Sequence, residues 1–258
     1  MVALILLDFS KAFDTINYEL LVAVPHYIGA NANVRKSFTS YLSNRYQKVK
    51  TADHISTSHL VQSGVPQGSI LEPTLYAVYT SCFSDYIQQS KVHFYADDTQ
   101  LYFSFKPENA QLASVLINED LHKLFSMSQD HCLKINSSKS YIMVFGNRNF
   151  RSALASQINA SIGGNNIQYV DAARNLGLYL DDSLCFKTHV SKAIQKAYAS
   201  LKLLYANRFM LNTNLEIMLC DSMVFSQFNF CDQVYGACLD KIDVNRVQRV
   251  QTACLRFI

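Results

Sequence analysis

The sequence has no long apolar run. No stretch reaches the roughly 20 apolar residues that a membrane-spanning helix needs, and the opening run MVALILL is far shorter. That run also lacks the basic segment and the small-residue cleavage site of a signal peptide. We therefore expect no membrane attachment, and we interpret residues 2–7 as a strand buried on both faces.

Paired cysteines are absent as well. The seven cysteines are scattered, form no C-x-x-C pair and have no histidine partner at zinc spacing, which argues against a zinc site. Reduced, mostly buried thiols are the expected alternative, and they are typical of an intracellular protein. The sequence does not distinguish the nucleus from the cytoplasm, and it indicates no oligomeric state.

The sequence also lacks a strong net charge. The total is only +3, which does not by itself indicate a nucleic-acid partner. The halves differ, however, because residues 1–129 contain 9 Lys/Arg and 11 Asp/Glu, whereas residues 130–258 contain 14 and 9. An acidic first half and a basic second half suit a cation-binding centre beside a phosphate-binding surface, although many unrelated proteins share so mild an asymmetry.

The hydrophobic pattern predicts an α+β protein in which a mainly antiparallel sheet packs on helices. From residue 187 onward the pattern is mostly helical, so we place a domain boundary near residue 185. Residues 108–131 fit a helix that carries Leu112, Leu116, Leu121 and Leu124. The predicted elements are helices at 17–28, 33–43, 73–88 and 108–131, strands at 47–51 and 139–146, a loop at 63–69 and a hairpin at 92–105.

Three carboxylates stand out because of where they fall in this pattern. Asp8 ends the first strand, and Asp97 and Asp98 lie at the turn of the expected hairpin. Carboxylates brought together at strand ends of one sheet repel each other unless cations bind between them, and hard oxygen ligands suit Mg²⁺. A pair of such ions can promote phosphoryl transfer. The competing interpretation is a polar turn and a strand cap without a metal.

Five segments occur in a fixed order: LDFSKAFDTINYELL at 7–21, SGVPQGSIL at 63–71, FYADDTQL at 94–101, LKINSSK at 133–139 and NLGLYLDDSLCFKTHV at 175–190. Together they resemble the palm motifs of reverse transcriptases from LINE-type, jockey-like non-LTR retrotransposons, and the resemblance covers essentially the whole chain. It implies a polymerase palm followed by a helical thumb-like region. It also implies RNA-directed DNA polymerisation with two Mg²⁺ ions, or Mn²⁺ in their place, and with an RNA template, a DNA primer and dNTPs as partners.

The resemblance implies roles for the acidic residues and their neighbours. Asp8 corresponds to the first catalytic, metal-binding aspartate. Asp97 and Asp98 correspond to the acidic, metal-binding pair of the YADD box, and Tyr95 is its tyrosine. Phe13 corresponds to the aromatic gate under the incoming sugar, where its bulk would exclude a 2′-OH and favour dNTPs. Without the resemblance, an ordinary core aromatic is the simpler interpretation of Phe13.

Four further residues of the palm have implied roles. Gln67 resembles the glutamine near the incoming nucleotide, and the flanking Gly68 would let the backbone approach a substrate closely. Lys139 resembles the lysine near the leaving pyrophosphate, where a cation can donate a proton or offset charge. A solvated surface lysine is the alternative. We interpret Asp14 as structural, holding the turn after the first strand.

The resemblance also divides the chain, into a palm at 1–185 and a thumb-like region at 186–258. Leu176 and Gly177 resemble the start of the primer-grip hairpin. Lys192, Lys196 and Lys202 lie on the polar side of the helix that begins near residue 187, and we expect them to contact the nucleic-acid backbone. A solvated helix face is the alternative interpretation.

Two departures from the family pattern affect the expected activity. Glu72 replaces the usual glycine of GSILGP, and an anion there would obstruct or repel nucleic acid. The chain begins shortly before Asp8, whereas relatives carry a fingers subdomain upstream, so we expect weak or absent polymerisation by this chain alone. The alternative functions are an inactive palm-like remnant that at most binds nucleic acid, and a group II intron maturase.

Overall fold

The structure is a computed structural model that describes residues 1–147, 149–150 and 157–258. The chain divides into two compact units, Met1–Tyr169 and Val170–Ile258. The division falls ahead of the boundary placed near residue 185, because strand β13 (Leu178–Asp181) packs on helix α7 (Lys187–Ala206). No helix among the described residues combines the length and apolar character needed to cross a bilayer.

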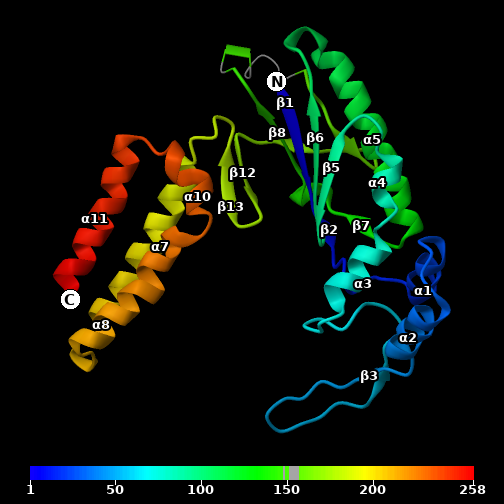
Figure 1. The fold of residues 1–258 in the computed structure, drawn as a ribbon, viewed down its shortest axis with the longest axis horizontal. Helices are drawn as coiled ribbons and strands as arrows, with labels where there is room; N and C mark the ends of the chain where they lie inside the picture. Colours follow the sequence, from blue (N-terminus) through cyan, green and yellow to red (C-terminus); the bar gives the residue numbers. More distant parts are fainter. Residues whose placement is uncertain (148, 151–156) are drawn as a thin grey trace. The chain divides into compact units, whose positions relative to one another are not determined.

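A five-stranded sheet in the order β11-β8-β1-β6-β5 forms the middle of the N-terminal unit (Figure 1). The central strand β1 (Val2–Leu7) runs antiparallel to β6 (Asp98–Ser104) and to β8 (Tyr141–Phe145). Strand β5 (Lys91–Tyr95) forms a hairpin with β6, and β11 (Gln168–Tyr169) pairs parallel with β8. The predicted first strand and hairpin are therefore confirmed, in a sheet that is antiparallel apart from β11.

Strand β1 is buried on both faces, as its uninterrupted apolar sequence predicts. Ala3, Ile5 and Leu7 belong to the main core, and each is at most 3% exposed. Leu4 and Leu6 alternate with them and are at most 9% exposed. Since both faces are covered, the position and direction of this strand are strongly fixed, and so is the place where it ends, at Leu7.

Helix α5 (Ala110–Asp130) lies along the sheet (Figure 1) and packs Leu121 and Leu124 into the main core. The predicted helix is confirmed, although Leu112, one of its four leucines, is 56% exposed. The buried positions at the start of the helix are instead Ala110 and Ala113. Small residues there allow close packing, whereas a leucine at position 112 falls on the outer side of the turn.

Asp120 is a fully buried carboxylate on the inner face of α5. Its two oxygens accept hydrogen bonds from the backbone N–H groups of Gln88, Gln89 and Ser90, at distances from 2.6 to 3.4 Å. A buried charge is tolerated when hydrogen bonds replace its water. This contact fixes the segment that enters β5 and so supports the hairpin that carries Asp97.

The first two predicted helices are confirmed as α1 (Tyr18–Tyr27) and α2 (Ala32–Leu42), both capped by asparagine side chains. The single helix expected over 73–88 is wrong, since the chain forms α3 (Glu72–Tyr79) and the short α4 (Phe83–Tyr86). The Thr80 hydroxyl donates to the carbonyl of Tyr76 at 3.0 Å. A side-chain bond of this kind competes with the regular helical pattern at the end of α3.

Short elements complete the N-terminal unit. The strand predicted at 47–51 is present only at its start, followed by an isolated bridge between Lys50 and Ile55. The remaining elements are the strand pairs β2 (Phe9–Ser10) with β7 (Lys134–Ile135), β3 (Tyr46–Gln47) with β4 (His59–Leu60) and β9 (Ser161–Ile162) with β10 (Asn165–Asn166), and 3₁₀ turns at Pro107–Asn109 and Ser137–Lys139.

The C-terminal unit is mostly helical, as predicted. Its core is formed mainly by α7 and α11, with Leu201 and Leu204 packed in one cluster with Val250 and Phe257. Its elements are the hairpin of β12 (Ala172–Asn175) and β13, α7, α8 (Thr213–Leu219), a π-helical turn at Cys220–Phe225, α9 (Ser226–Asn229), α10 (Asp232–Tyr235), α11 (Lys241–Phe257) and 3₁₀ turns at Arg208–Met210 and Gly236–Cys238.

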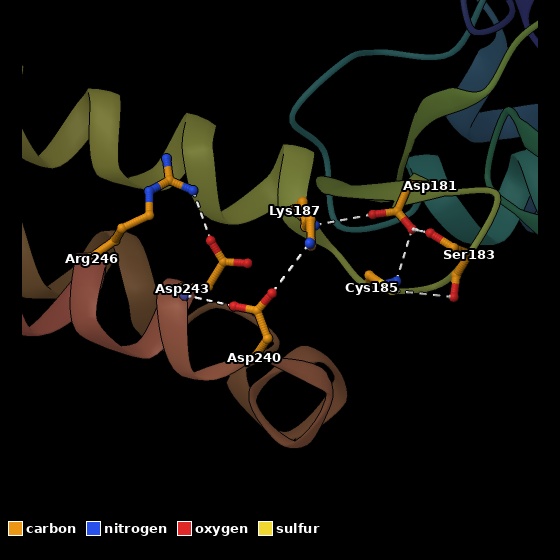
Figure 2. Close-up of polar contacts among 7 residues, drawn as sticks. All are labelled: Asp181, Ser183, Cys185, Lys187, Asp240, Asp243 and Arg246. Carbon is orange, nitrogen blue, oxygen red and sulfur yellow. Dashed lines mark hydrogen bonds and ion pairs between the residues drawn. The ribbon is translucent and has the colours of Figure 1, made fainter.

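The start of α7 is held by a polar network (Figure 2). Phe186 precedes the helix in a left-handed conformation and provides no side-chain cap. The Asp181 carboxylate substitutes for that cap by accepting from the backbone N–H groups of Cys185 at 2.8 Å and Lys187 at 3.1 Å. The Lys187 ammonium in turn pairs with Asp240 at 3.2 Å, which ties α7 to the beginning of α11. These contacts connect the hairpin, α7 and α11.

Candidate active site

Asp8 and Asp97 lie at the same end of the central sheet. Leu7 pairs with Thr99, so the residue after β1 lies beside the beginning of β6. Tyr95 pairs with Asp98 across the hairpin, which leaves Asp97 in its two-residue turn. The Asp97 carboxylate is close enough to Asp8 to raise the pKa of the Asp8 carboxyl. The strand register places these two acidic side chains at the same end of the sheet, and the raised pKa of Asp8 is consistent with their proximity.

The hairpin turn has an unusual backbone. Ala96 has a φ of +53°, a left-handed conformation that a residue with a Cβ adopts at some cost. Two-residue hairpin turns commonly use glycine at a position of this kind. Tyr95 and Asp98, which flank the turn, are both exposed. Strained backbone is often retained where function needs a particular side-chain position, and here it positions Asp97.

Lys139 is the cation of this group. Burial raises the pKa of the Asp8 carboxyl above its usual value of 3.8, the Lys139 ammonium lowers it, and the Asp97 carboxylate raises it. The backbone explains the position of the lysine, because the N–H of Asn136 donates to the carbonyl of Asp8 at 2.8 Å. The 3₁₀ turn Ser137–Lys139 follows directly. The segment LKINSSK thus carries its lysine to the carboxylates.

Replacing Asp8 with asparagine is expected to stabilise the chain at pH 7. A carboxyl whose pKa is raised in the folded state favours folding only while protonated, so its contribution is present below pH 3.8 and is lost as the pH rises through the higher folded value. The ionised Asp8 carboxylate therefore destabilises the folded state at pH 7, and Asp8→Asn removes that destabilisation. We expect the Tm to rise by about 1–3 °C at pH 7 and to change little near pH 3.5, measured by circular dichroism.

The matched control is Asp53→Asn in the exposed loop after β3, which should leave the Tm unchanged at both pH values. A lower Tm for Asp8→Asn at pH 7, or the same gain at both pH values, contradicts an unfavourable ionised carboxyl at position 8.

Phe13 is linked to the carboxylates through Tyr76, a residue that the sequence reasoning missed. The two rings lie 4.8 Å apart between centroids, with Phe13 half-buried and Tyr76 only 1% exposed. Burial raises the pKa of the Tyr76 phenol well above its usual value, and the nearby Asp97 carboxylate raises it further. The Tyr76 hydroxyl has no hydrogen-bond partner among the described residues. The sequence offers no signal that separates Tyr76 from an ordinary core tyrosine.

The loop at 63–69 packs directly on the segment after the first strand. The N–H of Val65 donates to the carbonyl of Phe13 at 2.8 Å. Gly64 has a φ of +82°, and a Cβ there would lie 2.9 Å from the Asp14 backbone, so glycine is required. The Gln67 amide donates to the Asp14 carboxylate at 2.8 Å. Asp14 therefore holds the Gln67 side chain in the loop. The prediction for Asp14 was a structural role in the turn after the first strand, and this hydrogen bond is a more specific contact.

Glu72 makes a local contact in the same loop. Its carboxylate accepts a hydrogen bond from the backbone N–H of Gly68 at 2.5 Å, and its own N–H donates to the carbonyl of Ser69 at 3.3 Å. As the first residue of α3, it also lies where a negative charge is favourable. The anion that departs from the family pattern thus stabilises the loop that carries Gln67.

The carboxylates of this site fit a metal ion whose remaining ligands come from a substrate and water. In the part of the chain that the structure describes, no group of three or more His, Cys, Asp or Glu side chains is arranged to hold a metal ion by itself. Mg²⁺ is usually bound by one or two carboxylates together with substrate phosphates and water. The closely placed Asp8 and Asp97 provide two such carboxylates, and Asp98 follows at the start of β6.

The predicted nucleic-acid contacts all lie in the C-terminal unit. Lys192, Lys196 and Lys202 are exposed side chains on α7. Leu176 and Gly177 form the turn of the β12–β13 hairpin, with φ values of +47° and +87°. A cavity of about 220 Å³ is lined by Lys192 and Lys196 but not by Lys202.

Together, the fold and the site define an α+β protein with acidic residues gathered at one end of an antiparallel sheet. The model of the family described as "Reverse transcriptase (RNA-dependent DNA polymerase)" matches residues 2–177. The chain belongs to this family. The expected fold class, a polymerase palm with a mainly antiparallel sheet followed by a mostly helical region, is confirmed. Proteins of the family are, in general, nucleotidyltransferases that use divalent metals.

The curated relatives confirm the resemblance to LINE-type elements. The chain is 28% identical over 230 residues to the RNA-directed DNA polymerase from mobile element jockey of Drosophila melanogaster, covering 85% of this chain and 24% of that protein. It is 26% identical to the probable RNA-directed DNA polymerase from transposon BS of the same organism, covering 98% of this chain and 28% of that protein. The chain thus spans about a quarter of the length of these relatives.

Among solved structures, the chain is similar to apo telomerase from Candida tropicalis, with a TM-score of 0.48 and 11% identity, over 98% of this chain and 46% of the other.

Proposed function

We propose that the chain is the palm and thumb portion of a non-LTR retrotransposon reverse transcriptase, which extends a DNA primer with dNTPs on an RNA template. The observation that carries the proposal is the meeting of Asp8 and Asp97 at one end of the sheet, fixed by the pairing of Leu7 with Thr99. Acidic residues positioned by strand ends are the ligands that two-metal phosphoryl transfer uses.

Asp8, Asp97 and Asp98 are the residues proposed to hold two Mg²⁺ ions, with Mn²⁺ as a substitute. When bound, the metals would activate the attacking primer hydroxyl and stabilise the leaving oxygen. The chain's own contribution is positioning, because both strand ends are fixed by the sheet. Lys139, already close to Asp8, would offset charge on the leaving pyrophosphate.

The remaining proposed contacts concern the nucleotide and the nucleic acid. Phe13 would exclude the 2′-OH of an incoming sugar, and Gln67 and Gly68 would contact the nucleotide from the loop, beside Tyr95 of the hairpin. We propose residues 1–185 as the palm and 186–258 as the thumb. The polar face of α7, with Lys192, Lys196 and Lys202, is proposed to contact the template–primer backbone.

Metal-dependent primer extension tests this function. The assay compares residues 1–258, a chain that includes the upstream residues of its gene, and the same longer chain with Asp97→Asn. We expect extension on poly(rA) only by the longer chain with intact Asp97. The polymerase role fails for this protein if the longer chain is no more active than its Asp97 variant. Robust extension by residues 1–258 alone would overturn the expectation that fingers are needed.

The second candidate is an inactive remnant that only binds nucleic acid, and Glu72 is the observation that favours it. Its half-buried carboxylate already occupies the Gly68 N–H in the loop proposed to contact substrate. Glu72→Gln keeps the size and hydrogen-bonding ability of the side chain but removes the charge. We expect it to strengthen binding of an RNA–DNA hybrid by about two- to fivefold at low salt, measured by fluorescence anisotropy.

Glu119→Gln, on the exposed side of α5, removes the same charge away from the loop and should leave the affinity unchanged. Equal affinities of the Glu72 variant and the parent chain would show that this carboxylate does not repel nucleic acid.

A further inference from the structure

The chain forms a bulge opposite Asp8. Strand β8 pairs with β1 as far as Leu6, and β7 pairs with β2 from Phe9 onward. Residues 136–140, which connect β7 to β8, therefore lie opposite Leu7 and Asp8, and they fold into a 3₁₀ turn. Bulges are frequent next to active sites, where they redirect a side chain. The side chain that this bulge carries toward the carboxylates is the lysine at its end.

Three hydrogen bonds close a ring between Asp8 and the bulge. The N–H of Asn136 donates to the carbonyl of Asp8 at 2.8 Å. The Ser140 hydroxyl donates to the carbonyl of Asn136 at 2.8 Å and accepts from the N–H of Asp8 at 3.4 Å. In a regular antiparallel pair, a backbone carbonyl of the neighbouring strand accepts such an N–H. The Ser140 hydroxyl takes the place of that carbonyl, so both ends of the bulge are connected to Asp8.

Lys139 is attached to the same ring. Its backbone N–H donates to the carbonyl of Asn136 at 3.1 Å, so this carbonyl accepts from both the lysine and the Ser140 hydroxyl. The Asn136 side chain begins the turn by accepting from the N–H and the hydroxyl of Ser138, at 3.2 and 2.7 Å. The Lys139 side chain itself is exposed. Its backbone is thus tied to Asp8, whereas its ammonium is accessible to a substrate.

Ser140 is fully buried, with an exposed fraction of 0%, although it follows an exposed lysine. A buried hydroxyl is tolerated when hydrogen bonds satisfy it, and here it both donates and accepts. Alanine at this position would keep most of the packing but remove both bonds. Because β1 is also paired with β6, this loss would displace the turn more than it would displace Asp8. The hydroxyl therefore acts on the lysine, through the backbone.

We propose that Ser140 is a positioning residue for nucleotidyl transfer, which holds the turn that carries Lys139 in a fixed position relative to Asp8. The inference rests on the proposed function, in which Asp8 binds metal and Lys139 offsets charge on the leaving pyrophosphate. A misplacement of about 1 Å can reduce a rate about 100-fold. Since the two backbone bonds to the Asn136 carbonyl and from its N–H remain without the hydroxyl, we expect a partial loss.

A double-mutant cycle in the chain that includes the upstream residues of its gene tests the proposal. Ser140→Ala is expected to lower the initial rate of dNTP incorporation on poly(rA) by about three- to tenfold, and Lys139→Ala by at least as much. In the Lys139→Ala chain, Ser140→Ala should lower the rate by less than about twofold more, because the lysine that it positions is already absent. Losses that multiply would overturn the proposal, since a general loss of active protein does not depend on Lys139.

Ser128→Ala is the matched control. Ser128 is equally buried, and its hydroxyl donates to the carbonyl of Phe125 at 2.8 Å within α5. Both serine variants should lower the Tm by about 2–4 °C, since each loses a buried hydrogen bond. The Ser128 variant should keep the parent rate within about twofold. Equal rate losses for the two variants would overturn the proposal in favour of general destabilisation.

Amide hydrogen exchange in residues 1–258, followed by NMR, tests the link without requiring catalysis. Ser140→Ala should speed exchange at the N–H groups of Asp8 and Lys139 by about tenfold, and it should change the amides of β6 far less. Unchanged exchange at Lys139 would overturn the proposal, because the hydroxyl would then not hold the turn.

Failure of this inference is distinguishable from failure of the proposed function. If the longer chain extends a primer and Ser140→Ala keeps the parent rate, the polymerase stands and the positioning role of Ser140 is overturned. If the longer chain extends no primer, the proposed function fails, and the exchange rate at Lys139 still decides whether Ser140 holds the turn.

Discussion

Asp97→Asn is expected to reduce metal-dependent primer extension by about 100- to 1,000-fold in a chain that includes the upstream residues of its gene. The amide keeps the size of the carboxylate but removes the charge that would hold a metal against the substrate phosphate. The carboxylate of Asp97, in the hairpin turn, raises the pKa of both Asp8 and Tyr76, so its negative charge affects both neighbours. The measurement is the initial rate of dNTP incorporation on poly(rA) at saturating Mg²⁺.

Asp85→Asn is the matched control, because Asp85 is an exposed aspartate on α4 of the same unit. It should retain the parent rate, and both variants should retain the parent affinity for the hybrid. A rate loss below tenfold for Asp97→Asn, with the control unchanged, would remove Asp97 from the proposed metal ligands.

Phe13→Val is expected to raise the use of rNTPs relative to dNTPs by about 10- to 100-fold. The ring is half-buried and lies 4.8 Å between centroids from the buried Tyr76 ring, tilted by 44°, so it has little freedom to move away from a 2′-OH. Valine opens that space and removes the steric barrier. The measurement is the ratio of kcat/KM for UTP and dTTP in the longer chain.

Phe103→Val makes the same substitution on β6, where the side chain pairs across from Ala3 away from the carboxylates. It should lower stability without changing the nucleotide ratio. If both variants change the ratio equally, general loosening of the core explains the effect. If neither does, Phe13 is a core aromatic, the simpler interpretation of its sequence.

The parts of the fold that the sequence predicts well are those with a strong local pattern. Val2–Leu7 is apolar at every position, and Asp97 lies between two β-prone runs, so the central strand and the hairpin could be located. The break after Tyr79 could not, because it depends on Thr80 and on contacts with distant residues.

The candidate site likewise contains residues that the sequence indicated and residues that it did not. The family resemblance indicated Asp8, Phe13 and Lys139, and the pairing of β1 with β6 and β8 explains how residues so far apart meet. Tyr76 was missed because a buried tyrosine next to Leu75 resembles any core residue.

The central position of β1 has a consequence for how the chain acquires its structure. Leu7 pairs with Thr99, and Val2 pairs with Phe145, so both neighbours of this strand come from about 90 to 140 residues further along. Until β6 and β8 are present, a strand of six residues with apolar side chains on both faces has nothing to cover it. Such a segment slows folding and favours aggregation during synthesis. The strand that positions Asp8 in the finished protein is therefore a segment that stays uncovered until residue 145 has been synthesised.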